Sequence, residues 1–120
     1  MPTPKHFNLL AVALPVVLGG CASQQSLYQW GSYEDQVHAY YAKSDSSPRA
    51  SQIAALEANI EQARANNKPL PPGYFAHLGM LHHSSGNLDR AGAAFESEKT
   101  LFPEAASWIN RLLAAIGRKP

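Results

Sequence analysis

The chain has 120 residues, a formal net charge of +1 and a single cysteine. Its ten lysines and arginines are scattered and nearly balanced by nine acidic residues, which excludes the basic stripe of a nucleic-acid-binding domain. Because one cysteine cannot form an intrachain disulfide, packing alone must stabilise what is, from its length, one small domain.

Residues 1–20 have the features of a bacterial lipoprotein signal peptide. An apolar run over residues 7–18 is too short to span a bilayer and leads into the small residues of Leu18-Gly19-Gly20-Cys21. Small residues before a lone cysteine resemble a lipobox, which implies cleavage before Cys21 and attachment of acyl chains such as palmitate. Ala22 resembles the sorting pattern for the outer membrane. The alternative is an ordinary signal peptide with a chance cysteine.

We therefore expect a lipid anchor at Cys21 that holds the protein on the periplasmic face of the outer membrane. Residues 21–31 are predicted to be the lipidated tether. Residues 32–117 are predicted to form the folded domain, with residues 118–120 as its tail.

The first part of the domain is predicted to contain two helices, at residues 33–43 and 48–67. Apolar and aromatic side chains recur in both segments every three or four residues, which is typical of an amphipathic helix. In the second segment they are Ile53, Leu56, Ile60 and Ala63. Three prolines between residues 69 and 72 predict a stiff connector to the next helix.

Residues 72–105 form the most regular part of the sequence. Phe75 lies three residues before the pair Leu78-Gly79, and a turn glycine, Gly86, is followed by a small residue, an aromatic and a proline. This spacing resembles one tetratricopeptide repeat, a pair of antiparallel helices with a period of about 34 residues. The two departures are His82, where the repeat usually has a large aromatic, and Glu98, where it usually has alanine.

The last helix is predicted at residues 104–117 and resembles the helix that caps a repeat array. One face of it is apolar and must be covered, with Ala105, Trp108, Ile109, Leu112, Leu113 and Ile116. The predicted fold is all-α, with about five helices arranged as TPR-like helical hairpins. The spacing of Glu98 from Ala91 and Phe95 points its carboxylate inward, so we expect a buried bond, with Arg111 or Trp108 as possible partners, or else a solvated position at the rim.

Four sequence blocks extend the resemblance over nearly all of the mature chain. They are Tyr28 to Asp35, Leu56 to Glu61 with the connector that ends at Gly73, Ala76 to Gly79, and Phe95 to Glu104. Together they resemble a family of small TPR-like bacterial lipoproteins of unassigned function. Members are typically encoded beside a lipoprotein similar to the curli secretion channel. The resemblance implies an accessory role in an envelope complex and supplies no catalytic residues.

The sequence offers little to support catalysis or metal binding. His82 and His83 are adjacent and therefore diverge by roughly 100° around a helix, and His77 is five residues away from the pair. This spacing does not match a helical metal site, and no nucleophile motif such as G-x-S-x-G is present. We expect no enzyme activity, no cofactor and no metal.

The predicted function is protein interaction, in a groove lined by the first helix of the repeat and by the last helix. Helical offset from Leu78-Gly79 assigns the following residues to this groove: Ala76, Met80, His83, Ser84, Asn110 and Arg111. The alternative is that the protein's own first helices cover this groove in place of a partner. A second candidate surface comprises Tyr28, Trp30, Tyr33, Tyr40 and Tyr41. These aromatic side chains either contact the membrane, contact a partner or pack in the core.

The expected role is an assembly module in an envelope lipoprotein complex, whose partner is another envelope lipoprotein. The alternative is a structural or envelope-stress lipoprotein that binds peptidoglycan or lipid. A polar cleft that stacks on sugars would favour the alternative, whereas an apolar groove favours a protein partner.

Overall fold

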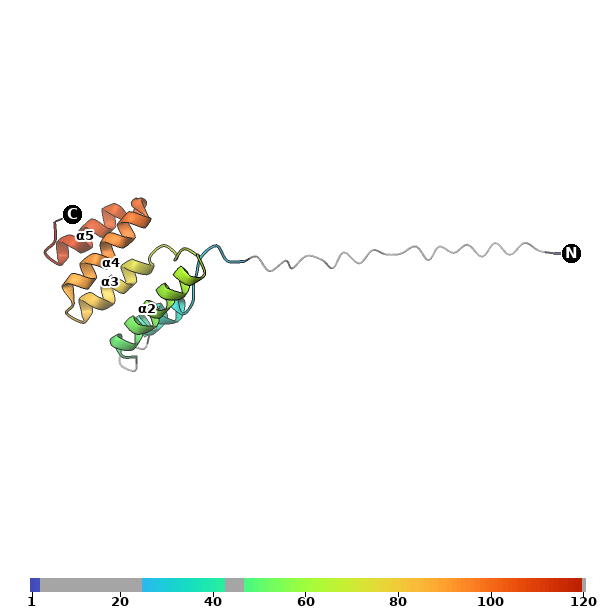
Figure 1. Cartoon of the computed structure of the whole chain (residues 1–120), viewed down its shortest axis with the longest axis horizontal. Coiled ribbons are helices and arrows are strands. Elements are labelled where there is room, and N and C mark those ends of the chain that lie inside the picture. The colour runs from blue at the N-terminus through green and yellow to red at the C-terminus, as the bar shows by residue number, and fades with distance from the viewer. Residues whose placement is uncertain (3–24, 43–46, 120) are drawn as a thin grey trace.

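The computed structural model describes residues 1–2, 25–42 and 47–119, and these residues contain α-helices and no β-strand (Figure 1). The expected all-α fold is confirmed. In chain order the elements are α1 (Tyr33–Ala42), α2 (Arg49–Ala65), α3 (Tyr74–Ser84), α4 (Leu88–Leu101), the 3-10 turn η1 (Pro103–Ala105) and α5 (Ala106–Ala115). Residues 3–20 of the predicted signal peptide and the lipidation site at Cys21 lie outside the described residues. Within the described part of the chain, each helix is too short or too polar to cross a membrane.

The helix ends lie close to those predicted from the sequence. Helix α2 ends before Asn67, whose positive φ of 50° stops the helical path, and the prolines that follow prevent its continuation. The predicted last helix is divided in two, because Pro103 begins the 3-10 turn η1 before α5 starts. Proline suits this position since the first turn of a helix leaves its N–H groups unbonded.

Helices α3 and α4 form an antiparallel hairpin at the centre of the domain, with α5 along one side and α2 on the other (Figure 1). The two helices approach closely because Gly79 on α3 has no side chain and the ring of Phe95 on α4 fills the space against it. Two clusters of buried side chains result. The cluster between α2 and the hairpin contains Leu56, Ala63, Leu70, Tyr74, Leu78, Leu81 and Ala94, and the one towards α5 contains Ala76, Ala91, Phe95, Ile109 and Leu113.

Glu98 is almost fully buried and binds the start of α3. Its carboxylate accepts hydrogen bonds from the backbone N–H groups of Gly73 (2.6 Å), Phe75 (3.1 Å) and Ala76 (3.3 Å). A helix N-terminus favours negative charge because its first N–H groups lack partners within the helix. The predicted burial of Glu98 is confirmed, whereas its proposed partners Arg111 and Trp108 were wrong.

The left-handed backbone of Gly73, with φ of 87°, lets the connector turn so that its own N–H faces this carboxylate. The negative charge of the Glu98 carboxylate also affects Tyr33 of helix α1. Burial raises the pKa of the Tyr33 hydroxyl above its usual value, and the nearby Glu98 carboxylate raises it further. Tyr33 is therefore a neutral phenol in the folded protein.

Residues 28–31 are bound to α2 through a buried amide. Asn59 donates from Nδ2 to the carbonyl of Trp30 at 3.3 Å and to the Tyr74 hydroxyl at 3.2 Å. That hydroxyl donates in turn to the carbonyl of Leu56 at 2.8 Å. Burial raises the pKa of Tyr74 to about 12, against the opposing effect of the Asn59 hydrogen bond. Tyr74 thus remains a hydrogen-bond donor in the core.

The apolar face of α5 is only partly covered. Ile109 and Leu113 are fully buried, and Leu112 and Ile116 pack at the edge of the same cluster. Trp108 was expected on the covered face but keeps 44% of its surface exposed. The reason is geometric, since α5 lies at the edge of the domain against one side of the α3–α4 hairpin, and this contact covers a narrower stripe than the sequence pattern offers.

Candidate functional site

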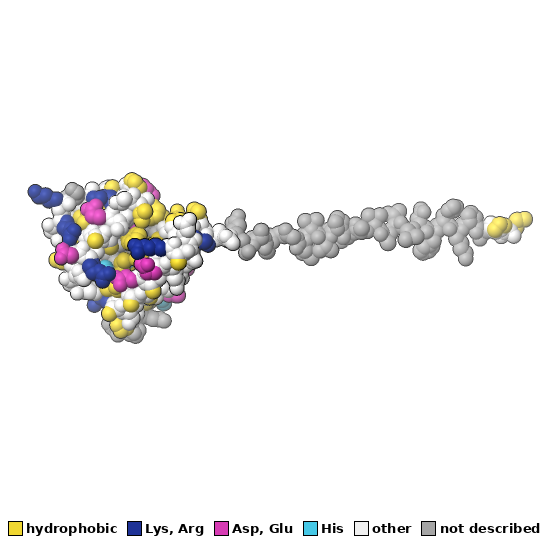
Figure 2. Space-filling model, viewed as in Figure 1, with side chains coloured by type: hydrophobic (Ala, Val, Ile, Leu, Met, Phe, Trp, Pro, Cys, Tyr) yellow, Lys and Arg dark blue, Asp and Glu magenta, His cyan; other side chains and the backbone are white. Residues whose placement is uncertain are grey.

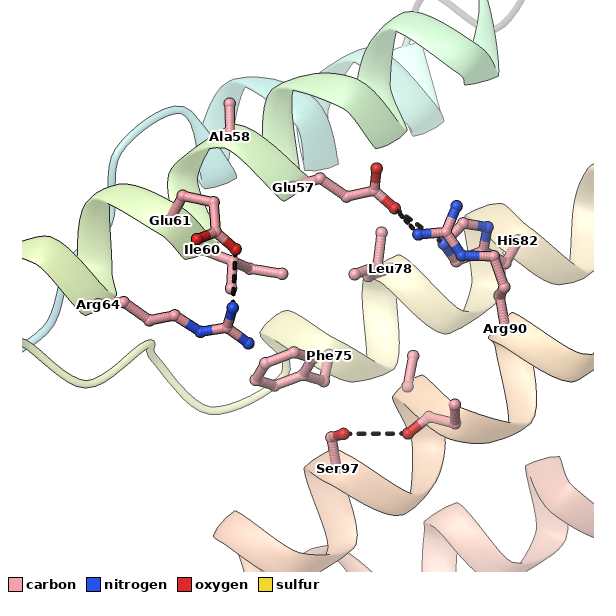
Figure 3. A pocket seen from close by; sticks show the side chains of 12 residues that line it. Glu57, Ala58, Ile60, Glu61, Arg64, Phe75, Leu78, His82, Arg90 and Ser97 are labelled. Carbon is pink, nitrogen blue, oxygen red and sulfur yellow. Dashed lines mark hydrogen bonds and ion pairs between the residues drawn. The ribbon is translucent and has the colours of Figure 1, made fainter.

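A groove crosses the domain where α2 lies over the α3–α4 hairpin, and we name it the α2–α4 groove. Its cavity volume is about 550 Å³. Ile60, Phe75 and Leu78 project into it from α2 and α3 (Figure 3) and form an apolar floor. The exposed Ala93 lines it from α4.

Charged side chains at the edge of the α2–α4 groove are paired with one another. Glu57 bonds the guanidinium of Arg90, and Glu61 bonds Arg64 at 2.8 Å (Figure 3). The Glu57–Arg90 pair joins α2 to α4, whereas the Glu61–Arg64 pair lies within α2. Each pair is neutral, so the groove presents little net charge. Exposed pairs of this kind contribute less than about 1 kcal/mol each to stability.

His82 lies at one end of the α2–α4 groove, buried beneath the Glu57–Arg90 pair. Its Nε2 is 3.6 Å from a Glu57 carboxylate oxygen. Burial lowers the pKa of His82 below 6.5, and the positive charge of Arg90 lowers it further, against the opposing effect of Glu57. At neutral pH, His82 is therefore an uncharged hydrogen-bonding side chain rather than a cation.

A second hollow of about 540 Å³ continues from the first towards the start of the described domain. The two share Ile60, Arg64 and Phe75. The second hollow is more apolar, and its other lining residues are Tyr28, Ala63, Asn67, Lys68, Pro69, Leu70, Leu101 and Phe102. The two hollows thus adjoin, with His82 at the far end of the first and Tyr28 in the second.

The groove residues expected from the sequence lie on the other side of the hairpin, and the structure brings only some of them together. Met80, His83 and Ser84 line a cavity of about 140 Å³, with Tyr40 of α1 and Leu112 of α5 among its other walls. This cavity is about a quarter of the size of the α2–α4 groove. Tyr40 therefore covers part of it, as the alternative reading of the sequence anticipated.

The other three expected residues lie outside that cavity. Ala76 is buried against Phe95 and Ile109 in the core. Asn110 accepts a hydrogen bond from Lys99 Nζ at 3.3 Å, and Arg111 donates to the backbone carbonyl of Ser107 at 3.4 Å.

The aromatic residues near the tether also separate into two groups. Tyr33 and Tyr40 pack half-buried against the core cluster that involves α2. Trp30 and Tyr41 are exposed, and Tyr28 lines the second hollow. Only part of this aromatic set is thus available to a partner or a membrane.

His77 joins α3 to α1 through aromatic contacts and predicts a pH dependence of stability. Its ring lies edge-on to Tyr40 at 5.4 Å and to Tyr33 at 6.0 Å, and its buried Nε2 has no hydrogen-bond partner among the described residues. Burial lowers the pKa of His77 below 6.5, with a backbone hydrogen bond at Gln36 opposing the shift. The folded state therefore takes up a proton less readily than the unfolded chain.

Because the folded-state pKa of His77 is depressed, the stability that depends on its neutral form is complete above about pH 6.5 and falls as pH drops. We expect the free energy of unfolding, measured with urea between about pH 7.5 and 5, to fall less in His77→Gln than in the wild type. His82 titrates in the same direction in both proteins, so their difference isolates His77. His38→Gln, at an exposed position, should keep the wild-type pH dependence, and an unchanged slope in His77→Gln would overturn this assignment.

The described residues contain no group of three or more histidine, cysteine or acidic side chains placed to hold a metal ion. The acids in the α2–α4 groove serve ion pairs with arginines instead. The site is therefore a groove with an apolar floor and an edge of paired charges.

The fold and this groove define a small all-α domain with an apolar-floored groove on its surface. The profile of a family described as a domain of unknown function (DUF4810) matches residues 27–112, which include all five α-helices up to Leu112. The chain belongs to this family. No curated protein and no solved structure matches the chain significantly.

Sequence analysis missed the α2–α4 groove because its residues divide into two familiar patterns. Ile60, Phe75 and Leu78 repeat at core positions, while Glu57 and Glu61 have the spacing of a solvated helix face. A helical pattern shows which side chains face a neighbour but not whether that neighbour fills the space. Ala58 and Ala93, two small residues on facing helices, were the available signal, since small side chains leave the groove open.

Proposed function

We propose that this protein is a TPR-like interaction module of the outer membrane. It is anchored at Cys21, faces the periplasm and binds another envelope lipoprotein in a secretion-channel-like complex. The observation that carries the proposal is the α2–α4 groove, with its apolar floor and an edge of paired charges. A protein interface has the same anatomy, with an apolar centre and a polar rim.

The TPR-like interpretation rests on the α3–α4 hairpin and the helices on either side of it. Gly79 against Phe95 and Ala91 in the buried seam provide the small–large packing on which such hairpins depend. Helix α5 lies along the hairpin in the place of a capping helix. We propose one complete repeat, 72–105, preceded by the degenerate pair α1 and α2.

The occupant that best fits the α2–α4 groove is an amphipathic helix of the partner. Three apolar floor residues on neighbouring helices match the anchors that a helix presents at successive turns. The charged side chains along the edge are paired with one another. An apolar helix that covers the floor therefore does not bury an unpaired ion, and binding carries no desolvation cost of that kind. This electrical neutrality favours a protein face over an acidic or basic ligand.

A crosslinking pull-down from intact envelopes tests the proposal, with the lipidated wild type compared with Ala93→Arg and Ala114→Arg. Ala93 is exposed in the groove, so an arginine there blocks the floor without entering the core. Ala114 is exposed on α5 away from the three hollows and is the matched control. We expect the wild type and Ala114→Arg to recover a lipoprotein that resembles a secretion channel. Ala93→Arg should recover about tenfold less of it, which corresponds to a loss of about 1.4 kcal/mol in binding free energy.

Two other outcomes have defined meanings. Loss of the partner in Met80→Glu but not in Ala93→Arg would move the interface to the smaller cavity between α3 and α5. Recovery of no envelope protein by any variant would reject the assembly role and favour the alternative, a structural lipoprotein that binds peptidoglycan or lipid.

A further inference from the structure

The exposed apolar residues of the domain include a group beside the segment that leads to the anchor. Leu27 is 71% exposed and Leu101 is 55% exposed, and Trp30 is exposed as well. Tyr28 lies between them, because its ring contacts Trp30 edge-on at 6.3 Å and lines the same hollow as Leu101. Figure 2 shows hydrophobic side chains on this side of the domain.

The tether is fixed to the folded domain at this place. The N–H of Gln29 donates to the carbonyl of Pro69 at 2.8 Å, which ties the segment to the connector between α2 and α3. Figure 1 shows the segment passing beside that connector. Lys68 lies in the same connector and lines the second hollow with Tyr28 and Leu101. We name this set the tether pole, comprising Leu27, Tyr28, Trp30, Lys68, Leu101 and Phe102.

The length of the chain before the tether pole limits its distance from the anchor. Tyr28 lies seven residues after Cys21, and seven residues span at most about 25 Å even when fully extended. If the acyl chains on Cys21 are in the bilayer, the tether pole is the part of the domain nearest to the lipid. Attachment also raises its effective concentration at the surface, so a weak contact is enough for binding.

We infer that the tether pole rests in the head-group region of the membrane that holds the anchor, an inference that depends on the proposed lipidation of Cys21. Tryptophan and tyrosine favour this region because each combines an apolar ring with a polar atom. Leu27 and Leu101 add apolar surface, and Lys68 extends its amine towards the water while its methylene chain stays at the interface.

Charge plays little part in this contact. Of the two cations that line the second hollow, Arg64 is paired with Glu61, which leaves Lys68 as the one charged member of the tether pole. The contact is therefore with a bilayer surface through aromatic and apolar side chains, and it does not require anionic lipid. In this orientation the α2–α4 groove extends away from the membrane, where a partner can reach it.

Spin labels at the two ends of α4 test the inference. Leu101 and Leu88 are its last and first residues, are 55% and 46% exposed, and lie about 20 Å apart along the helix. We use the lipidated mature protein in phosphatidylcholine vesicles, with a nitroxide on Leu101→Cys or, as the matched control, on Leu88→Cys. The accessibility of each label to a water-soluble nickel complex and to oxygen is measured by electron paramagnetic resonance.

We expect the label at position 101 to be severalfold less accessible to nickel and more accessible to oxygen than the label at position 88, at low and at high salt. Adding Leu27→Ser should weaken the membrane contact and raise the nickel accessibility of the label at position 101. Equal nickel accessibility at both positions, in protein that floats with the vesicles, would overturn the inference and leave the proposed function intact. Protein that does not float with the vesicles would instead reject the anchor, and both proposals would fall together.

Discussion

Replacement of Glu98 by alanine is expected to lower the free energy of unfolding by about 3–5 kcal/mol. The carboxylate accepts three backbone hydrogen bonds at the start of α3, from donors 22 to 25 residues away. Removing it leaves Gly73, Phe75 and Ala76 without an acceptor and takes the favourable charge from the helix N-terminus. Urea unfolding at neutral pH, followed by circular dichroism, measures the loss.

Two further variants identify the cause of this loss. Glu98→Gln keeps the shape and one acceptor oxygen but loses the charge, so we expect a loss between those of the wild type and Glu98→Ala. Glu96→Ala removes an acid two residues earlier on the same helix, one that bonds Lys99 at 2.9 Å near the surface. It should cost less than about 1 kcal/mol. Equal unfolding midpoints for Glu98→Ala and Glu96→Ala would contradict the role assigned to Glu98.

Gly79→Ala is expected to destabilise the domain by about 1–2 kcal/mol, although alanine is the better helix former. A methyl group at this position would lie 2.5 Å from Cε1 of Phe95, closer than atoms can approach, and the buried ring cannot move aside. Overpacking a core costs about 1–3 kcal/mol, and the close contact with a buried ring places this site in the upper part of that range, at about 2–3 kcal/mol. The gain in helix propensity of about 1 kcal/mol offsets only part of this cost. The measurement is again the unfolding free energy in urea.

Gly92→Ala is the matched control, at another buried glycine inside a helix of the same hairpin. Its methyl group would meet the side chain of Arg118, which bonds the exposed Asp89 and can move. We expect this variant to be neutral or slightly stabilising. If the clash with the ring is the cause at Gly79, the same substitution should cost less in a Phe95→Leu background. An equal cost in both backgrounds would show that the ring is not responsible.

The sequence allowed the helices to be predicted closely but the site only in part. The spacing of apolar residues and the positions of helix-breaking residues are local properties of the sequence. Repeated apolar residues and the prolines after Asn67 therefore predicted helices and helix ends that the structure confirms. Helical spacing also correctly predicted that Glu98 points inward. Met80, His83 and Ser84 share a cavity as helical offset suggested, whereas Ala76 is in the core and the larger groove lies on the opposite side of the hairpin.

What the sequence determined by itself is the all-α class, the approximate helix ends and many of the inward-facing residues, because these depend on the local period of the side chains. The tertiary structure decided the rest. The partners of Glu98 are backbone N–H groups, which every residue except proline carries and which no side-chain pattern reveals. The openness of the α2–α4 groove and the exposure of Trp108 depend on how far a neighbouring helix covers an apolar face, and only the packing of whole helices sets that distance.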